Sequence, residues 1–431
     1  MSCCGPSGSY SMLDQIFVKA KALLLSFLPD WLVPWVSILI GIGVIAAIAP
    51  VIMMYLTWFE RKVIARMQNR FGPDRVGVYG LMQPLSDGLK MLNKEDIVPR
   101  GADAIVHYLA PIVAVAPAIL LFAVIPFGRN MAAVDLNIGL LYILAVSSVS
   151  SYAIFMGGWS SRSKFSVLGA ARTVAQIISY EVPGVLSVVV VAMTAGTLSL
   201  VGIVEAQADR WYIFTPWGFA AAIIFFLCGT AEVNRTPFDM PEAESELVGG
   251  FHTEYSGMKF ALWYMAEFLE SFAVAAFTVT LFLGGWHGPA ISIPFGLAAL
   301  IGVALIATAK RLPIVAKGIG IPALAALGAL FWRDPIPSWI WFLTKTYLLV
   351  FVLVWFRGTL PRLRVDQLMG FAWKFLMPMT LLNILAAGLW SWYAFPVGTA
   401  LSVLVLGVGF WGLVKVNNPA PLSERTFVLA E

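Results

Sequence analysis

Charged residues are scarce in this 431-residue chain. Only 12% of the residues are charged and 60% are hydrophobic, and the mean hydropathy is +0.84. This composition excludes an ordinary soluble globular protein. The three cysteines are too few and too scattered for a disulfide framework or a cysteine-ligated cluster. We therefore expect any redox centre to belong to another chain.

Other signatures are also missing. No GxxxxGK phosphate loop occurs, and the dinucleotide-like "GVGFWG" at 407–412 lies in an apolar run with no preceding strand, which favours close helix packing. His252 and Glu254 have too few possible co-ligands elsewhere for a metal site. The net charge of +4 is modest and comes from loops between apolar runs, so it gives no support for nucleic-acid binding. No cleavable signal peptide is recognisable before the first run.

Long uncharged runs are what the chain has instead. A helix needs about 20 apolar residues to cross the hydrocarbon core, and only helices satisfy the backbone in such segments. The sequence thus predicts an all-α polytopic membrane protein of about 9–11 transmembrane helices with amphipathic surface helices. We expect spans at 34–58, 104–127, 136–159, 167–195, 216–233, 258–286, 336–356, 372–394 and 397–414.

Lys and Arg are concentrated in alternate connections, after the first, third and fifth spans and after 336–356. By the positive-inside rule these loops face the cytoplasm and the amino terminus lies on the opposite side. We expect a bacterial plasma membrane. No internal repeat or linker divides the chain, so 34–431 is predicted to be one transmembrane domain, with cytoplasmic loops at 59–103 and 234–257. Residues 1–33 would form a disordered tail or a surface helix.

Two further segments have distinct predictions. From Pro84 onward, Leu85, Leu89 and Leu92 recur at helical spacing, which predicts an amphipathic helix on the membrane face. Residues 291–335 contain two apolar arms around basic residues and read as an inserted hairpin. The second arm is short, so a re-entrant or surface-lying hairpin is the alternative to two crossings.

Ionisable residues inside apolar runs are costly and indicate function by default. Arg172 and Gln176 are four residues apart and Glu267 and Glu270 are three apart, so each pair shares a helix face that should point into the bundle. Glu181 shares a run with the first pair. The structural alternative is that Arg172 snorkels to the surface and that each Glu satisfies a local bond.

The stretch 232–254, "EVNRTPFDMPEAESELVGGFHTE", contains six of the 24 acids. With its flanks it closely resembles a loop of the H-type membrane subunit of respiratory complex I. The segments "ERKVIARMQNRFGPDRVGVYGLMQPLSDGLKML", "GAARTVAQIISYEVP" and "RGTLPRLRVDQLMGFAWKFLMP" share the resemblance. It covers roughly 34–286 and 336–385. Val78 and Arg162 depart from the common pattern, and neither is a candidate site residue.

The resemblance implies a subunit that anchors the peripheral arm of NADH-quinone oxidoreductase and forms much of its quinone chamber. Quinone would be the substrate, while NADH, FMN and iron-sulfur clusters would be held by partner subunits. The implied chamber residues are Arg61, Asp87, Lys90, Arg172, Arg235, Asp239, Glu242 and Glu244. A proton relay is implied by family likeness for Glu181, Glu232 and Glu267, and helical spacing adds Glu270.

Two other functions remain open at this stage. A membrane subunit of a membrane-bound hydrogenase or formate hydrogenlyase would share the fold without a quinone chamber, and the run "NRFGPDRVGVYGL" favours complex I over it. An independent ion transporter is disfavoured because no inverted repeat or interrupted helix pair is visible.

Overall fold

The structure, a computed structural model, describes residues 16–26, 29–240, 249–288, 337–393 and 396–417. Helices dominate these ranges, and no strand occurs within them. The α-helices are α1 (Ile16–Leu25), α2 (Val33–Met67), α3 (Gln83–Asn93), α4 (Ala104–Leu121), α5 (Gly139–Ser147), α6 (Val149–Ser160), α7 (Lys164–Ala195), α8 (Leu200–Ala206), α9 (Pro216–Glu232), α11 (Gly257–Phe282), α14 (Ser338–Thr359), α15 (Val365–Phe371), α16 (Met377–Trp392) and α17 (Val397–Asn417).

Eight helical segments in these ranges are long and apolar enough to cross a membrane, with α5–α6 and α15–α16 each counted as one segment. The 17-residue α9 is a shorter apolar helix. The predicted all-α polytopic membrane protein is therefore confirmed. The prediction of a single domain is not tested by the structure and stays a prediction.

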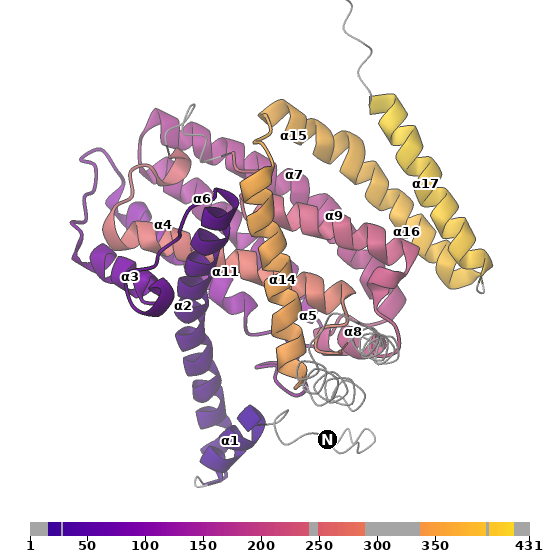
Figure 1. The fold of residues 1–431 in the computed structure, drawn as a ribbon, viewed down its shortest axis with the longest axis horizontal. Coiled ribbons are helices and arrows are strands. Elements are labelled where there is room, and N and C mark those ends of the chain that lie inside the picture. The colour runs from indigo at the N-terminus through magenta and orange to yellow at the C-terminus, as the bar shows by residue number, and fades with distance from the viewer. Residues whose placement is uncertain (1–15, 27–28, 241–248, 289–336, 394–395, 418–431) are drawn as a thin grey trace, which may run out of the picture.

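Helix α11 lies at the centre of the bundle. Its spanning window is 83% buried, against 11% for α2 and for α17. It packs against α4, α9, α14 and α2. In Figure 1, α2 and α14 run side by side on one flank, while α16 and α17 form the opposite edge. The side chains carried by α11 are therefore the ones most shielded from the surroundings.

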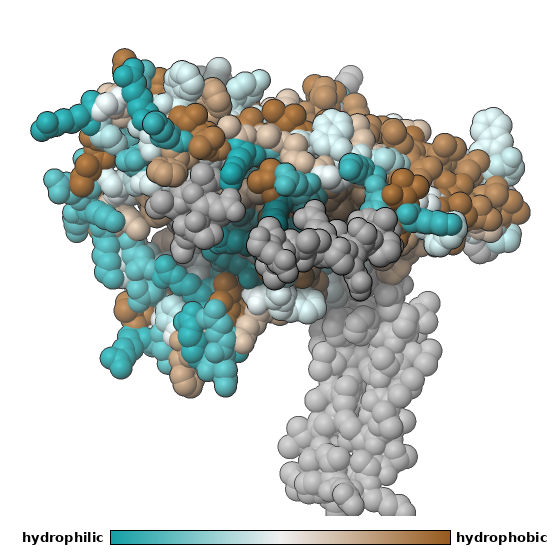
Figure 2. Space-filling view, turned by 90° about the horizontal axis from the view of Figure 1, so that it is seen from above, coloured by the Kyte–Doolittle hydropathy of each residue, from teal (hydrophilic) through white to brown (hydrophobic). Residues whose placement is uncertain are grey.

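Polar and apolar surfaces are separated on the end of the molecule seen in Figure 2. Hydrophilic residues gather on one half of this view, and hydrophobic residues gather on the half that holds the α16–α17 edge. Along α17, Leu404, Val408 and Trp411 are more than half exposed, as expected for a helix that faces lipid. This separation suits a membrane subunit with one wetted side.

Some boundaries differ from the expected ones. Helix α2 continues to Met67 rather than ending near 58, because 59–67 contains no glycine or proline. Glu60 and Arg61 thus lie on a membrane helix and not in a loop. The expected span 136–159 is broken at Ser148, which separates α5 from α6.

Helices occur in both segments for which a surface helix was considered. Helix α3 carries the exposed Leu85, Leu89 and Leu92, which confirms an amphipathic helix after Pro84. Within the predicted amino-terminal surface segment, α1 places Phe17 edge-on against Trp339 with ring centroids 5.8 Å apart. The hairpin predicted at 291–335 and the chamber residues Glu242 and Glu244 lie outside the described residues.

Candidate functional site: a buried charge network beside a carboxylate-lined cavity

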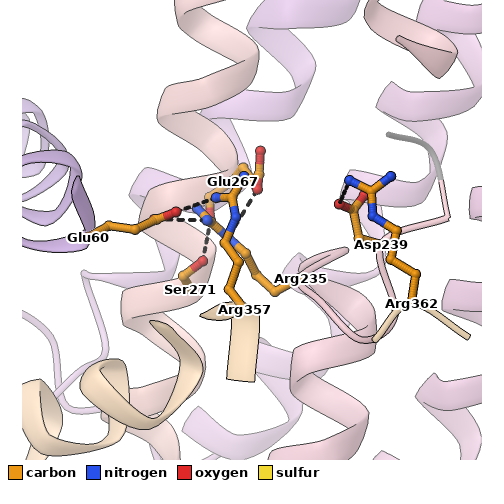
Figure 3. Close-up of polar contacts among 7 residues, drawn as sticks. All are labelled: Glu60, Arg235, Asp239, Glu267, Ser271, Arg357 and Arg362. Atoms are coloured by element: carbon orange, nitrogen blue, oxygen red, sulfur yellow. Dashed lines mark hydrogen bonds and ion pairs between the residues drawn. The ribbon is translucent and has the colours of Figure 1, made fainter. Parts of the chain in front are cut away.

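Arg235 is the centre of a buried charge network. It follows α9, and its Nη1 donates a hydrogen bond to Oε2 of Glu60 on α2 at 2.9 Å. Its Nε forms an ion pair with Oε1 of Glu267 on α11 at 3.0 Å, and its guanidinium stacks 4.3 Å from the Phe268 ring centroid. One guanidinium thereby joins three segments far apart in sequence, as Figure 3 shows. The planar fork of arginine suits this double contact.

A second arginine reaches the same carboxylate. Arg357 of α14 donates to Oε1 of Glu60, whose side chain is only 9% exposed. Ser271 of α11 points toward these guanidinium groups in Figure 3. Glu60 is therefore held between two cations, an arrangement that offsets the cost of burying its charge.

The turn that carries Arg235 is held from α7. Gln176, which is fully buried, donates from Nε2 to the carbonyl of Ala231 at 2.8 Å and to that of Phe238 at 2.7 Å. The prediction that Gln176 points into the bundle is thus confirmed. Arg172, one turn earlier on α7, is only partly buried. At the end of the turn, Asp239 pairs with Arg362 at 3.2 Å (Figure 3).

A small cavity, with about 50 Å³ of space for water-sized molecules, lies beside this network. Asp239 and His252 line it from the segment between α9 and α11, and Glu267 and Glu270 line it from α11. Ser150 of α6 also lines it. One predicted chamber residue and two predicted relay residues therefore share a single cavity.

Electrostatic interactions connect the four predicted relay carboxylates in a series. Glu181 acts on Glu232, and both Glu232 and Glu267 act on Glu270. Glu181 also shares a hydrogen bond with Ser148, and Ser147 lies close enough to Glu232 to interact with it. The structure thus orders these residues as Glu267, Glu270, Glu232 and Glu181, with the first two at the cavity.

Three other predicted chamber residues, Arg61, Asp87 and Lys90, form a separate, exposed cluster between α2 and α3. Arg61 Nη1 lies 2.6 Å from Asp87 Oδ2, and Lys90 Nζ lies 3.8 Å from Asp87 Oδ1. Burial alone would raise the pKa of Asp87, but hydrogen bonds from Arg61 and Gln83 and the charges of Arg61 and Lys90 lower it below its usual value. Among the described residues, none of this cluster lines the cavity at Asp239.

Lys345, a cation within the apolar helix α14, caps the end of α11. Its Nζ donates to the carbonyls of Leu283, Gly285 and His287 at 2.7–2.8 Å. Burial, followed by the charges of Arg129 and Lys345, lowers the pKa of His287 to about 4. Within the described ranges, no group of three His, Cys, Asp or Glu residues is arranged to hold a metal ion.

Comparison with known proteins decides the family. The family model described as NADH dehydrogenase matches residues 40–388. The chain belongs to the NADH dehydrogenase family. The resemblance to H-type complex I subunits is confirmed. Helix α17 lies beyond the part that the NADH dehydrogenase model matches.

Relatives within the NADH dehydrogenase family are similar over most of their length. The NADH-quinone oxidoreductase H subunit of Dehalococcoides mccartyi is 43% identical over 380 residues, covering 88% of this chain and 94% of the relative. An H subunit of the same enzyme from Geobacter sulfurreducens is 42% identical over 377 residues, covering 82% and 95%. The H subunit from a Geobacillus species is 43% identical over 360 residues, covering 82% and 95%. Relatives with this name are membrane subunits of complex I.

Sequence reasoning missed three members of the site in this NADH dehydrogenase family chain. The length of the first apolar run places Glu60 in a loop. Arg357 and Arg362 belong to the basic residues after 336–356, from which the sequence pattern indicates only the side of the membrane. A signal was present at Glu60, the one acid in "FERKVIAR". A lone carboxylate among three basic residues at the end of an apolar run is a candidate for a buried ion pair.

Proposed function

We propose that this chain is the H-type membrane subunit of a proton-translocating NADH-quinone oxidoreductase and that its cavity couples quinone reduction to proton movement. The observation that carries the proposal is the shared lining of the cavity by Asp239, Glu267 and Glu270. A quinone gains two protons when it is reduced by two electrons, so carboxylates beside the reduction site can respond to it. The names of the relatives favour this function over a hydrogenase subunit or an independent transporter.

The charge network can respond to protonation of a carboxylate in the cavity. Glu267 lines the cavity and also pairs with Arg235, which pairs in turn with Glu60. A proton arriving at Glu267 would cancel its attraction to Arg235, because only the carboxylate form carries the charge. Protonation of Glu267 would thus change the electrostatic interactions of the network as far as Glu60 and Arg357.

From the cavity, the proposed relay continues through Glu270 and Glu232 to Glu181. The electrostatic series among these residues supports this order. Carboxylates that interact strongly exchange protons as a coupled group, so a proton taken up at one end changes the affinity at the next. This chain would supply the relay and part of the quinone chamber, with Arg61, Asp87, Lys90 and Arg172 as further chamber residues.

Other subunits complete the proposed enzyme. NADH, FMN and iron-sulfur clusters would be bound by peripheral subunits, and small membrane subunits would continue the proton path. The basic connections after α2, α5–α6, α9 and α14 would face the cytoplasm of a bacterial cell. The segment 235–254 would contact a peripheral subunit, so proteases should cleave it slowly in the intact complex and rapidly after the peripheral arm is removed.

Glu181→Gln and Glu232→Gln test the relay, since glutamine keeps the shape and removes the charge change. We expect the complex to assemble with its redox centres and NADH-quinone turnover to fall together with proton translocation. Glu205→Gln on α8, an exposed acid outside the series, is the matched control. Wild-type turnover and proton translocation in both relay variants would show that these carboxylates are structural.

A further inference from the structure

The helix break between α5 and α6 is made of serines. Residues 146–151 read "VSSVSS". Ser147 and Ser148 hydroxyls donate to the carbonyl of Leu144 at 3.2 and 2.8 Å, and the Ser150 hydroxyl donates to the carbonyl of Ser147 at 2.8 Å. Serine side chains that bond to the backbone of the preceding turn compete with the helix ladder and bend helices. The break therefore has a local cause in the sequence.

The two adjacent serines also hold two carboxylates from different helices. Ser148 hydrogen-bonds with Oε1 of Glu181 on α7, and the Ser147 hydroxyl lies close enough to Glu232, at the end of α9, to interact with its carboxyl group. Both acids thus meet one short segment at the break. This contact could not be foreseen from the sequence, where 33 positions separate Ser148 from Glu181.

A serine hydroxyl has one proton to donate but can accept two hydrogen bonds. The Ser148 hydroxyl lies within reach of two acceptors, the Leu144 carbonyl and the Glu181 carboxylate, and it cannot donate to both at once. When Glu181 is ionised, the hydroxyl can donate to the carboxylate. When Glu181 is protonated, the carboxyl can donate to the serine oxygen while the hydroxyl turns to Leu144.

The same alternation is open to Ser147, which reaches the Leu144 carbonyl and Glu232. Each acid would then keep a hydrogen-bond partner in either protonation state. This matters wherever the assembled complex shields these groups from water, because a buried polar group left without a partner is strongly disfavoured. An alanine at either position would remove the partner from both states of the acid.

We propose that Ser147 and Ser148 are positioning residues for proton exchange between Glu232 and Glu181, acting as reversible hydrogen-bond partners that serve both protonation states of each acid. The inference rests on the proposed relay function. It adds that the break between α5 and α6 positions Glu232 and Glu181, the last two carboxylates of the series.

The test uses the intact complex with Ser147→Ala, Ser148→Ala and Ser148→Thr. Threonine retains the hydroxyl and can make the same bond to the preceding turn. We expect each alanine variant to lower NADH-quinone turnover about tenfold, as for loss of a hydrogen bond to a charged group. The threonine variant should stay within about twofold of wild type on the same scale. Ser187→Ala on α7, whose hydroxyl donates to the Gly184 carbonyl, is the matched control.

Infrared difference spectra between oxidised and reduced complex separate this role from a structural one. The carboxyl bands that disappear in Glu181→Gln should shift in Ser148→Ala and return in Ser148→Thr. Alanine variants with wild-type turnover and unshifted bands would overturn the inference. If only the glutamate variants lose activity, the serine inference alone fails. If the glutamate variants are also fully active, the relay itself fails.

Ser148→Cys covers the case in which alanine prevents assembly, because a thiol is similar in size and a weaker donor. Assembly with reduced turnover would support the inference. Assembly with wild-type turnover would contradict it, since the strength of the donor would then have no effect on the exchange.

Discussion

Replacing Arg235 by methionine removes a cation that pairs with both Glu60 and Glu267 while keeping much of the apolar stem. The side chain of Arg235 is 7% exposed, that of Glu60 is 9% exposed and that of Glu267 is 26% exposed. The change therefore leaves one buried and one partly buried carboxylate with less compensation. Glu60 keeps its contact with Arg357.

The magnitude follows from the geometry. Two unit charges about 3 Å apart attract by roughly 5 kcal/mol at an effective dielectric constant of about 20, and Arg235 makes two such contacts. Much of that attraction is offset by the cost of removing the arginine from water. Breaking a buried pair on one side costs about 3–5 kcal/mol in practice. We expect Arg235→Met to be in that range and Arg357→Met to cost less, because the Arg357 side chain is 33% exposed.

The assay is the abundance of assembled complex in membranes together with its thermal unfolding midpoint after purification. Arg235→Met should lower the midpoint by on the order of 5 °C and reduce assembly. Arg235→Lys is the charge-matched control, and it should recover only part of the loss because an ammonium cannot reproduce the two-sided fork or the stacking on Phe268.

A double variant sharpens the test. In Glu60→Gln with Arg235→Met, the acid that would be left short of a partner is also neutralised, so the combined loss should be smaller than the sum of the single losses. Arg235→Met complexes as stable as wild type, or strictly additive losses in the double variant, would refute the reasoning that this network is held by mutual charge compensation.

Three other changes have defined outcomes. Gly169→Ala places a Cβ 2.8 Å from the Cα of Gly250, so it should displace the segment whose His252 lines the cavity and destabilise the protein by about 1–3 kcal/mol. Quinone reductase activity and thermal stability should both fall, and unchanged values would contradict the close packing. Arg61→Gln should change stability by less than about 1 kcal/mol because its pair with Asp87 is exposed, and any effect should shrink as salt is added during thermal unfolding. The folded-state pKa of His287, about 4, lies below its usual 6.5, so between pH 4 and pH 6.5 the unfolded chain binds more protons than the folded chain. Stability should therefore be greatest above pH 6.5 and fall as the pH decreases to 4, and thermal unfolding of His287→Gln over the same pH range should show a weaker decline.

The membrane helices and the amphipathic α3 could be predicted because each depends on a short-range pattern. Apolar length predicts a span, and leucines at helical spacing predict α3. The acids of the relay could also be found, since a carboxylate in an apolar run is visible without a fold. The grouping of Glu267 and Glu270 with Asp239 around one cavity depended on how α11 packs beside the turn after α9.

The partners of those acids could not be predicted in the same way. Glu60 and Arg357 are 297 positions apart, and no local pattern indicates that α2 and α14 bring them together. The break at Ser148 was missed for a different reason, because "VSSVSS" is apolar enough to continue a span and its serines act through hydrogen bonds to the backbone and to the carboxylates. Tertiary packing decided the first outcome, and local serine hydrogen bonds that an apolar pattern does not reveal decided the second.

Glu270 gives the most direct test of coupling between the cavity and the relay, because it lines the cavity and interacts with both Glu267 and Glu232. The measurement is the number of protons translocated per electron by vesicles containing the Glu270→Gln complex, with NADH as donor and quinone as acceptor. A break in the middle of the series predicts that the complex assembles with intact redox centres and that turnover and proton translocation fall together. Wild-type turnover with wild-type proton translocation would contradict a path through this cavity.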